Sequence, residues 1–168
     1  MLNWGVFLDR DGVIVRQIDH LNHAEDLELI EGAGEAIAWL NDAGIPVIVV
    51  SNQAGIAKGY LTVADLEEIH ERLHRELAVF GAHLDALYYC PHHPQATVTE
   101  YLKDCPCRKP GTGMLARARD EHGIDPRCPT WSAIPRATSS LDHAPGAAQS
   151  SLGQALPGRM EYSKSSLI

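Results

Sequence analysis

The stretch Val6-Phe7-Leu8-Asp9-Arg10-Asp11-Gly12 decides the fold. Its apolar first half is typical of a buried strand in a parallel sheet, and Gly12 indicates that the strand ends near Asp9 and the backbone turns. Open α/β sheets bind ligands at the carboxyl ends of their strands, so Asp9 and Asp11 stand where a site forms. Two carboxylates there can hold a hard cation, or act as a nucleophile and an acid/base group. The alternative is an acidic loop without a catalytic role.

The length and composition limit the classes of protein to which the chain can belong. The 168 residues suffice for one domain with a substantial core. The formal net charge of −8 and the pI of about 5.5 argue against a nucleic-acid or membrane-surface partner. No apolar run is long enough to span a bilayer, and Asp9 and Asp11 interrupt any signal-peptide core. We therefore expect neither kind of partner, and we also expect the protein to be a cytoplasmic monomer.

Two further apolar runs, Ile45 to Val50 and Leu84 to Tyr89, predict neighbouring buried strands. The first leads into Ser51-Asn52-Gln53-Ala54, where a hydroxyl and free backbone amides can cradle a phosphate. An ordinary strand-to-loop cap explains the same residues equally well.

Three helices are predicted around these strands. The first runs from Glu31 to Gly44, and its inward side chains are expected to be Ala36, Ile37 and Leu40, with Trp39 beside them. The second begins at Thr62, which forms a capping-box pattern with Asp65. The third covers Gly113 to His122, with Met114, Leu115 and Ala118 inward.

Two histidines on the second predicted helix, His70 and His74, lie one turn apart. A metal could bind at this spacing, but charged neighbours surround both residues. We expect them on a solvated face.

Four thiol and imidazole groups have the spacing of a closed tetrahedral zinc site: Cys90, His92, Cys105 and Cys107. His93 is an alternative to His92, and free thiols in a loop are the alternative to the whole site. With four protein ligands the zinc would be structural and would fix the loop. The clustered cysteines favour a reducing cytoplasm over disulfides.

Arg108 and Lys109 follow the last of these cysteines directly. Arginine offers a planar fork to a phosphate and lysine a point charge. A zinc-fixed loop would orient both, whereas a solvated basic pair is the simpler interpretation.

Four segments together resemble the haloacid dehalogenase-like (HAD) phosphatases: Phe7–Gly12, Ser51–Gln53, Cys90–His93 and Cys107–Pro110. The resemblance runs from about Val6 to Pro126 and is nearest to the heptose bisphosphate phosphatase branch and its histidinol-phosphatase relatives. It implies an α/β fold, an HAD-like Rossmannoid three-layer sandwich with a mostly parallel sheet. We expect the C-terminal strands of that fold to be missing or disordered in this chain.

The resemblance also implies a mechanism. Asp9 would attack phosphorus and form an aspartyl phosphate, while Asp11 would protonate the leaving oxygen and then activate water. The Asp9 carboxylate and the Asp11 carbonyl would hold Mg²⁺. Ser51, Asn52 and Lys109 would stabilise the transferring phosphoryl group. The rest of the substrate would meet Gln17, Ile18, Asp19, His20, Asn52, Gln53, Ala54 and Arg108.

The expected activity is removal of a phosphate from a small phosphosugar, with heptose 1,7-bisphosphate as the first candidate substrate. Histidinol phosphate is the alternative within the family. An inactive zinc-binding remnant is the alternative from another class. The acidic charge and the Asp-x-Asp strand disfavour a zinc-ribbon module that binds nucleic acid.

One part of the family pattern is absent. A fourth strand ending in Gly-Asp, which completes the Mg²⁺ site, should follow Pro126, but residues 127–168 are rich in Ser, Pro, Gly and Ala and contain no strand-like run. We therefore expect a phosphatase domain over residues 1–126 and a disordered tail over 127–168. The loss of a Mg²⁺ ligand and an uncovered first strand predict weak or absent activity and a tendency to aggregate.

The genetic code suggests an origin for the tail. When the third base of each codon is read with the first two bases of the next, codons permitted by Cys128–Ser140 spell Ser-Tyr-Met-Val-Gly-Asp-Ser-Pro-Ser-Asp-Ile-Glu. This contains the missing Gly-Asp. We hypothesise a frameshift near Arg127, either real or introduced by sequencing.

Overall fold

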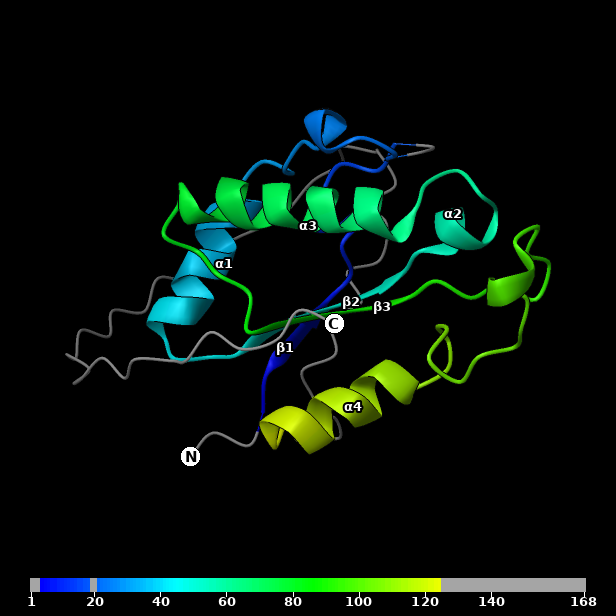
Figure 1. Cartoon of the computed structure of the whole chain (residues 1–168). Helices are drawn as coiled ribbons and strands as arrows, with labels where there is room; N and C mark the ends of the chain where they lie inside the picture. The colour runs from blue at the N-terminus through cyan, green and yellow to red at the C-terminus, as the bar shows by residue number, and fades with distance from the viewer. Residues whose placement is uncertain (1–3, 19–20, 125–168) are drawn as a thin grey trace, which may run out of the picture.

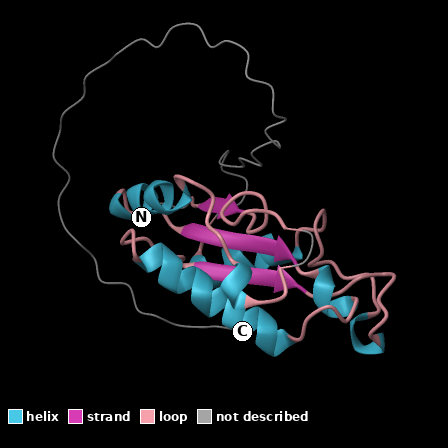
Figure 2. Cartoon of the chain, turned by 90° about the horizontal axis from the view of Figure 1, so that it is seen from above, coloured by secondary structure: helices cyan, strands magenta, loops and turns pink. Residues whose placement is uncertain are grey.

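A three-stranded parallel sheet forms the centre of the computed structural model, which describes residues 4–18 and 21–124. The strands β1 (Val6–Leu8), β2 (Val47–Asn52) and β3 (Ala86–Cys90) lie in the order β1-β2-β3. Their arrows point the same way in Figure 2, so their carboxyl ends meet at one end of the sheet. The predicted α/β fold with a parallel sheet is confirmed.

Helices cover both faces of the sheet (Figure 1). Helices α1 (Ala33–Asp42) and α3 (Val63–Ala78) lie on one face, and α4 (Gly113–His122) lies on the other. Three short helices lie in the connections: η1 (Ala24–Asp26), α2 (Ala54–Ala57) and η2 (Thr99–Tyr101). No helix in the described residues has both the length and the apolar character that a membrane span requires.

The central strand β2 supplies both cores. Val47 and Val49 belong to the core that includes side chains of α1 and α3, and Ile48 and Val50 belong to the core that includes side chains of α4. Successive side chains of a strand point to opposite faces, so a continuous apolar run fills the space on both sides. All four side chains are buried.

Local sequence explains where the long helices begin and end. The Thr62 hydroxyl accepts a hydrogen bond from the Asp65 amide, and the Asp65 carboxylate accepts one from the Thr62 amide at 2.7 Å. This is the predicted capping box, and it satisfies two amides that the first turn leaves free. Helix α4 ends at Gly123, whose φ of 66° suits glycine.

The predicted inward face of α1 was wrong in part. Ile37 is buried as expected, but Ala36 is exposed and Trp39 is 69% exposed. Gly34 is buried instead, because the ring of Phe80 packs directly against it. The ring is so close that a Cβ on Gly34 would collide with it. The close approach of this ring to the helix backbone shifts the buried stripe toward the glycine.

In the described part of the chain β1 pairs only with β2, which places the Asp9 strand at the edge of the sheet. The predicted tail, residues 127–168, and the end of the predicted phosphatase domain lie outside the described residues, as do Asp19 and His20.

Candidate active site

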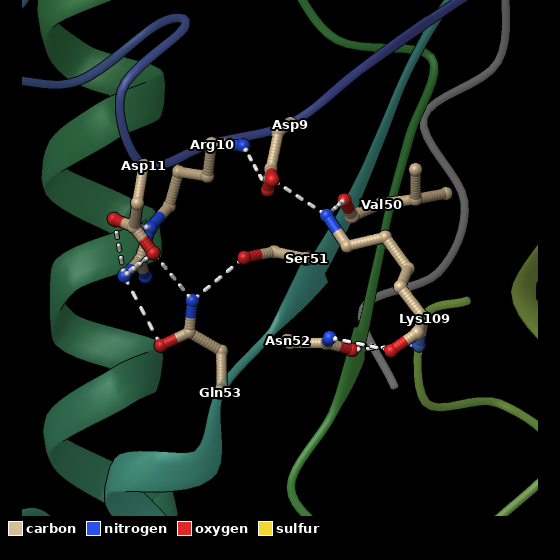
Figure 3. Close-up of polar contacts among 8 residues, drawn as sticks. All are labelled: Asp9, Arg10, Asp11, Val50, Ser51, Asn52, Gln53 and Lys109. Carbon is tan, nitrogen blue, oxygen red and sulfur yellow. Dashed lines mark hydrogen bonds and ion pairs between the residues drawn. The ribbon is translucent and has the colours of Figure 1, made fainter. Parts of the chain in front are cut away.

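Asp9 directly follows β1 at the carboxyl end of the sheet (Figure 3). The pairing of Leu8 with Val49, continued by one residue, brings Asp9 beside Val50. Asp9 Oδ1 accepts a hydrogen bond from the Arg10 amide at 2.9 Å, and Oδ2 forms an ion pair with Lys109 Nζ at 2.6 Å. The Asp9 side chain is held in one orientation while 40% of it remains exposed. It is therefore fixed and accessible to a phosphate.

Lys109 reaches this point from the loop before α4. Its ammonium group also donates a hydrogen bond to the Val50 carbonyl at 2.9 Å. The Asn52 side chain forms two hydrogen bonds with the Lys109 backbone. Its Oδ1 accepts from the Lys109 amide at 2.9 Å, and its Nδ2 donates to the Lys109 carbonyl at 3.2 Å. One β2 residue thus fixes the loop that carries the cation.

Asp11 points away from Asp9 toward a second polar group (Figure 3). The Arg10 guanidinium donates to both Asp11 carboxylate oxygens, from Nε at 2.9 Å and from Nη2 at 3.0 Å. Gln53 Nε2 also donates to Asp11 Oδ2 at 2.9 Å. Gly12, with φ of 79°, makes the turn that leads the chain away from this carboxylate.

Ser51 and Gln53 lie on the Asp11 side of the site. Ser51 is buried, and its Oγ accepts a hydrogen bond from Gln53 Nε2 at 2.7 Å. Asn52, between them, is engaged with Lys109. The alternation of β2 therefore divides the predicted phosphate-binding residues between two polar groups.

The expectation that His70 lies on a solvated face was wrong. It is buried on α3, and its Nε2 lies 3.4 Å from Nη1 of Arg10, which is itself only 2% exposed. Burial, and then the Arg10 charge, lower the pKa of His70 to about 3. A signal was present in the sequence, because His70 continues the apolar stripe of Leu66 and Leu73 at helical spacing. Arg10 and His70 are the two site residues that the sequence reasoning missed.

The other predicted substrate residues have separate positions. Gln17 lies beside Gly12, and Ile18 is 39% exposed in the same loop. Ala54 begins α2, and Arg108 Nη1 donates to the His92 carbonyl at 3.3 Å. Their contacts with a substrate remain predictions.

Three of the four predicted zinc ligands form a cluster. One side-chain donor atom of each of Cys90, His92 and Cys105 lies within 4.8 Å of the other two, and Cys90 Sγ is 3.7 Å from His92 Nδ1. The Cys107 thiol is outside this trio. His93 accepts a hydrogen bond from the Gln95 amide and is not part of the cluster. The geometry thus favours His92 over His93.

The comparison with protein families covers β1, β2 and β3. The model of the haloacid dehalogenase-like hydrolase family matches residues 6–99, from the strand before Asp9 past the first two cluster residues. The chain belongs to the haloacid dehalogenase-like hydrolases.

Relatives in this family include two enzymes named D-glycero-beta-D-manno-heptose-1,7-bisphosphate 7-phosphatase. The one from Escherichia coli (strain K12) is 43% identical over 120 residues, which are 71% of this chain and 63% of the relative. The one from Photorhabdus laumondii is 44% identical over 122 residues, 71% of this chain and 64% of the relative. The chain therefore spans less than two thirds of these relatives.

Solved structures give the same family. The D,D-heptose 1,7-bisphosphate phosphatase from B. bronchiseptica, complexed with magnesium and phosphate, matches with a TM-score of 0.65 and 34% identity, over 73% of this chain and 65% of that one. A putative HAD-like phosphatase from Mesorhizobium loti matches with a TM-score of 0.70 and 35% identity, over 74% and 59%.

Proposed function

We propose that the chain is a Mg²⁺-dependent phosphatase that removes a phosphate from a small phosphosugar, with heptose 1,7-bisphosphate as the first candidate. The observation that carries the proposal is the partly exposed Asp9 carboxylate, held 2.6 Å from the Lys109 ammonium at the carboxyl end of β1. The names of the similar enzymes support the choice of substrate. Histidinol phosphate is the alternative to be tested beside it.

In this mechanism an Asp9 oxygen attacks the phosphorus atom, the bond to the leaving oxygen breaks, and the phosphoryl group is carried on Asp9. Asp11 gives a proton to the leaving oxygen. It then takes one from the water that hydrolyses the aspartyl phosphate. Lys109, with Ser51 and the Asn52 amide, stabilises the negative charge on the phosphoryl oxygens.

The oxygen donors at the end of β1 fit Mg²⁺. This ion is bound in such sites by one or two carboxylates, substrate phosphate and several waters. The Asp9 carboxylate is partly exposed and retains free lone pairs beside its two hydrogen-bonding partners, and the Asp11 carbonyl is the second proposed ligand. When bound, Mg²⁺ would neutralise charge on the phosphoryl group.

The donor set of the cysteine–histidine cluster fits a structural zinc ion. Ligands about 2.3 Å and 2.1 Å from a tetrahedral zinc lie about 3.6 Å apart, near the 3.7 Å between Cys90 Sγ and His92 Nδ1. Cys105 and Cys107 would complete the set. The proposed zinc would fix the loop that leads to Arg108 and Lys109.

We extend the proposal to the compartment, partners, domain range and oligomeric state of the enzyme. Reduced thiols suit the cytoplasm. The acidic charge suits a protein without a nucleic-acid partner. We assign the phosphatase domain to residues 1–126 and propose that it acts as a monomer.

The test is turnover of p-nitrophenyl phosphate by the purified full chain, with Mg²⁺ and with a chelator. We expect weak turnover that requires Mg²⁺ and is abolished in the Asp9→Asn variant, which removes the nucleophile. Heptose bisphosphate and histidinol phosphate are then compared by kcat/KM. A folded, zinc-loaded chain with no Mg²⁺-dependent turnover would contradict the proposal and favour the zinc-binding remnant.

A further inference from the structure

A buried chain of hydrogen bonds runs from α3 to the second aspartate of the site. The Arg10 guanidinium bonds Asp11 through Nε and Nη2, and its Nη1 lies 3.4 Å from His70 Nε2. Gln53 Oε1 accepts a further hydrogen bond from Nη2 at 3.1 Å. His70 is 3% exposed and Arg10 2%, so water cannot readily replace either partner.

The direction of the contact with His70 follows from chemistry. A guanidinium group has only donors, so His70 Nε2 must be the acceptor and the imidazole must be neutral with its proton on Nδ1. The pKa of His70, lowered to about 3 by burial and by Arg10, keeps the ring neutral in solutions near neutrality. The tilted ring of Tyr89, with its centroid 5.7 Å away, packs against the imidazole.

The guanidinium group is rigid and planar, which couples its two ends. The Nε and Nη2 atoms face Asp11, whereas Nη1 faces His70. If the histidine acceptor is removed, Nη1 becomes a buried donor without this partner, and a buried unpaired donor is costly. Turning the group toward another acceptor would take Nε and Nη2 away from the Asp11 carboxylate.

We propose that His70 is a positioning residue for the acid/base step: it sets the orientation of Arg10, and Arg10 sets the orientation of Asp11. The inference rests on the proposed phosphatase function. It assigns a role to α3, a helix that supplies none of the expected catalytic groups.

The test compares two substrates that differ in their need for a proton donor. The p-nitrophenolate group leaves without protonation, whereas the alkoxide of glycerol 2-phosphate needs a proton from the acid. For His70→Leu we expect kcat/KM to fall about tenfold with glycerol 2-phosphate and less than about twofold with p-nitrophenyl phosphate. His70→Gln, which keeps an acceptor, should recover the glycerol 2-phosphate value to within about threefold. Equal losses on both substrates, or no loss on either, would overturn the inference.

Two controls separate positioning from folding. His74→Leu makes the same change at an exposed histidine one turn along α3, and should leave both values unchanged. His70→Phe keeps a ring against Tyr89 but has no acceptor, and it replaces His70→Leu if circular dichroism shows that variant to be unfolded.

A second measurement is independent of turnover. The Nε proton of Arg10, identified in ¹⁵N NMR spectra by its loss in Arg10→Lys, should exchange slowly in the unmodified chain and in His70→Gln, and faster in His70→Leu. If the unmodified chain has no turnover but the proton behaves in this way, the proposed function fails while the positioning contact stands. An exchange rate that is the same in all three proteins would overturn the contact.

Discussion

Lys109 Nζ lies 2.6 Å from Asp9 Oδ2, and the same nitrogen donates to the Val50 carbonyl. The cation is therefore fixed by a strand carbonyl as well as by the carboxylate that it faces. Because the Val50 carbonyl also holds the ammonium group, Lys109 should keep its position when a phosphate enters the site and attracts this positive charge.

Removal of this cation should impair catalysis more than folding. For Lys109→Met we expect kcat/KM for p-nitrophenyl phosphate to fall about 100-fold, the usual effect of losing one preorganised charge partner of a transition state. Lys58→Met removes an exposed lysine from the loop after α2 and should stay within about twofold of the unmodified chain. A loss below threefold for Lys109→Met would contradict the assigned role.

Zinc content gives a prediction that does not depend on activity. Mass spectrometry of the purified chain should find about one zinc per chain, and Cys90→Ser or Cys105→Ser should lose most of it, because the thiolates are the strongest ligands of the set. Cys128→Ser and His93→Ala alter residues outside the proposed ligand set and should retain the metal. Full zinc occupancy in Cys105→Ser would rule out the proposed site.

The buried His70 predicts a pH dependence of stability. Its pKa is about 3 in the folded chain and about 6.5 when unfolded, so the unfolded state binds more protons between these values. The free energy of unfolding should therefore fall as the pH drops below about 6.5, with a contribution of up to about 1.4 kcal/mol per pH unit from this group. Urea unfolding of the unmodified chain and of His70→Gln between pH 7 and pH 5 checks this. Parallel pH profiles would show that His70 does not contribute.

A substitution at Gly111 tests whether zinc binding and the position of Lys109 depend on the same backbone conformation of this loop. A Cβ at this position would collide with the carbonyl oxygens of Pro106 and Arg108, which belong to the loop backbone and cannot turn aside as a side chain can. Gly111→Ala should therefore lower zinc content and p-nitrophenyl phosphate turnover together. Gly123→Ala, at the end of α4, should cost about 1 kcal/mol of stability through its positive φ but leave zinc content unchanged.

The sequence predicted the elements that local patterns control. The three apolar runs became the three strands, and Thr62 with Asp65 began α3 as its capping pattern indicated. Lys109 was placed in the site from its family motif, and the structure brings it to Asp9.

What the sequence did not reveal depends on contacts between distant segments. An arginine is normally expected to be solvated, and nothing in the local sequence indicates that Arg10 is buried. Its burial is explained only by its partners Asp11, Gln53 and His70. The buried face of α1 likewise followed from Phe80 packing on Gly34, a contact that helical spacing does not encode.

The alternation of side chains along β2 limits which insertions and deletions this segment can accept. Val47, Val49 and Ser51 lie on one side of the sheet, and Ile48, Val50 and Asn52 lie on the other. Insertion or deletion of a single codon within this strand would exchange the two sides beyond the lesion, turning Asn52 toward Asp11 and Ser51 toward Lys109. Changes of length in this segment should therefore be tolerated only in pairs of codons, however conservative the added residue.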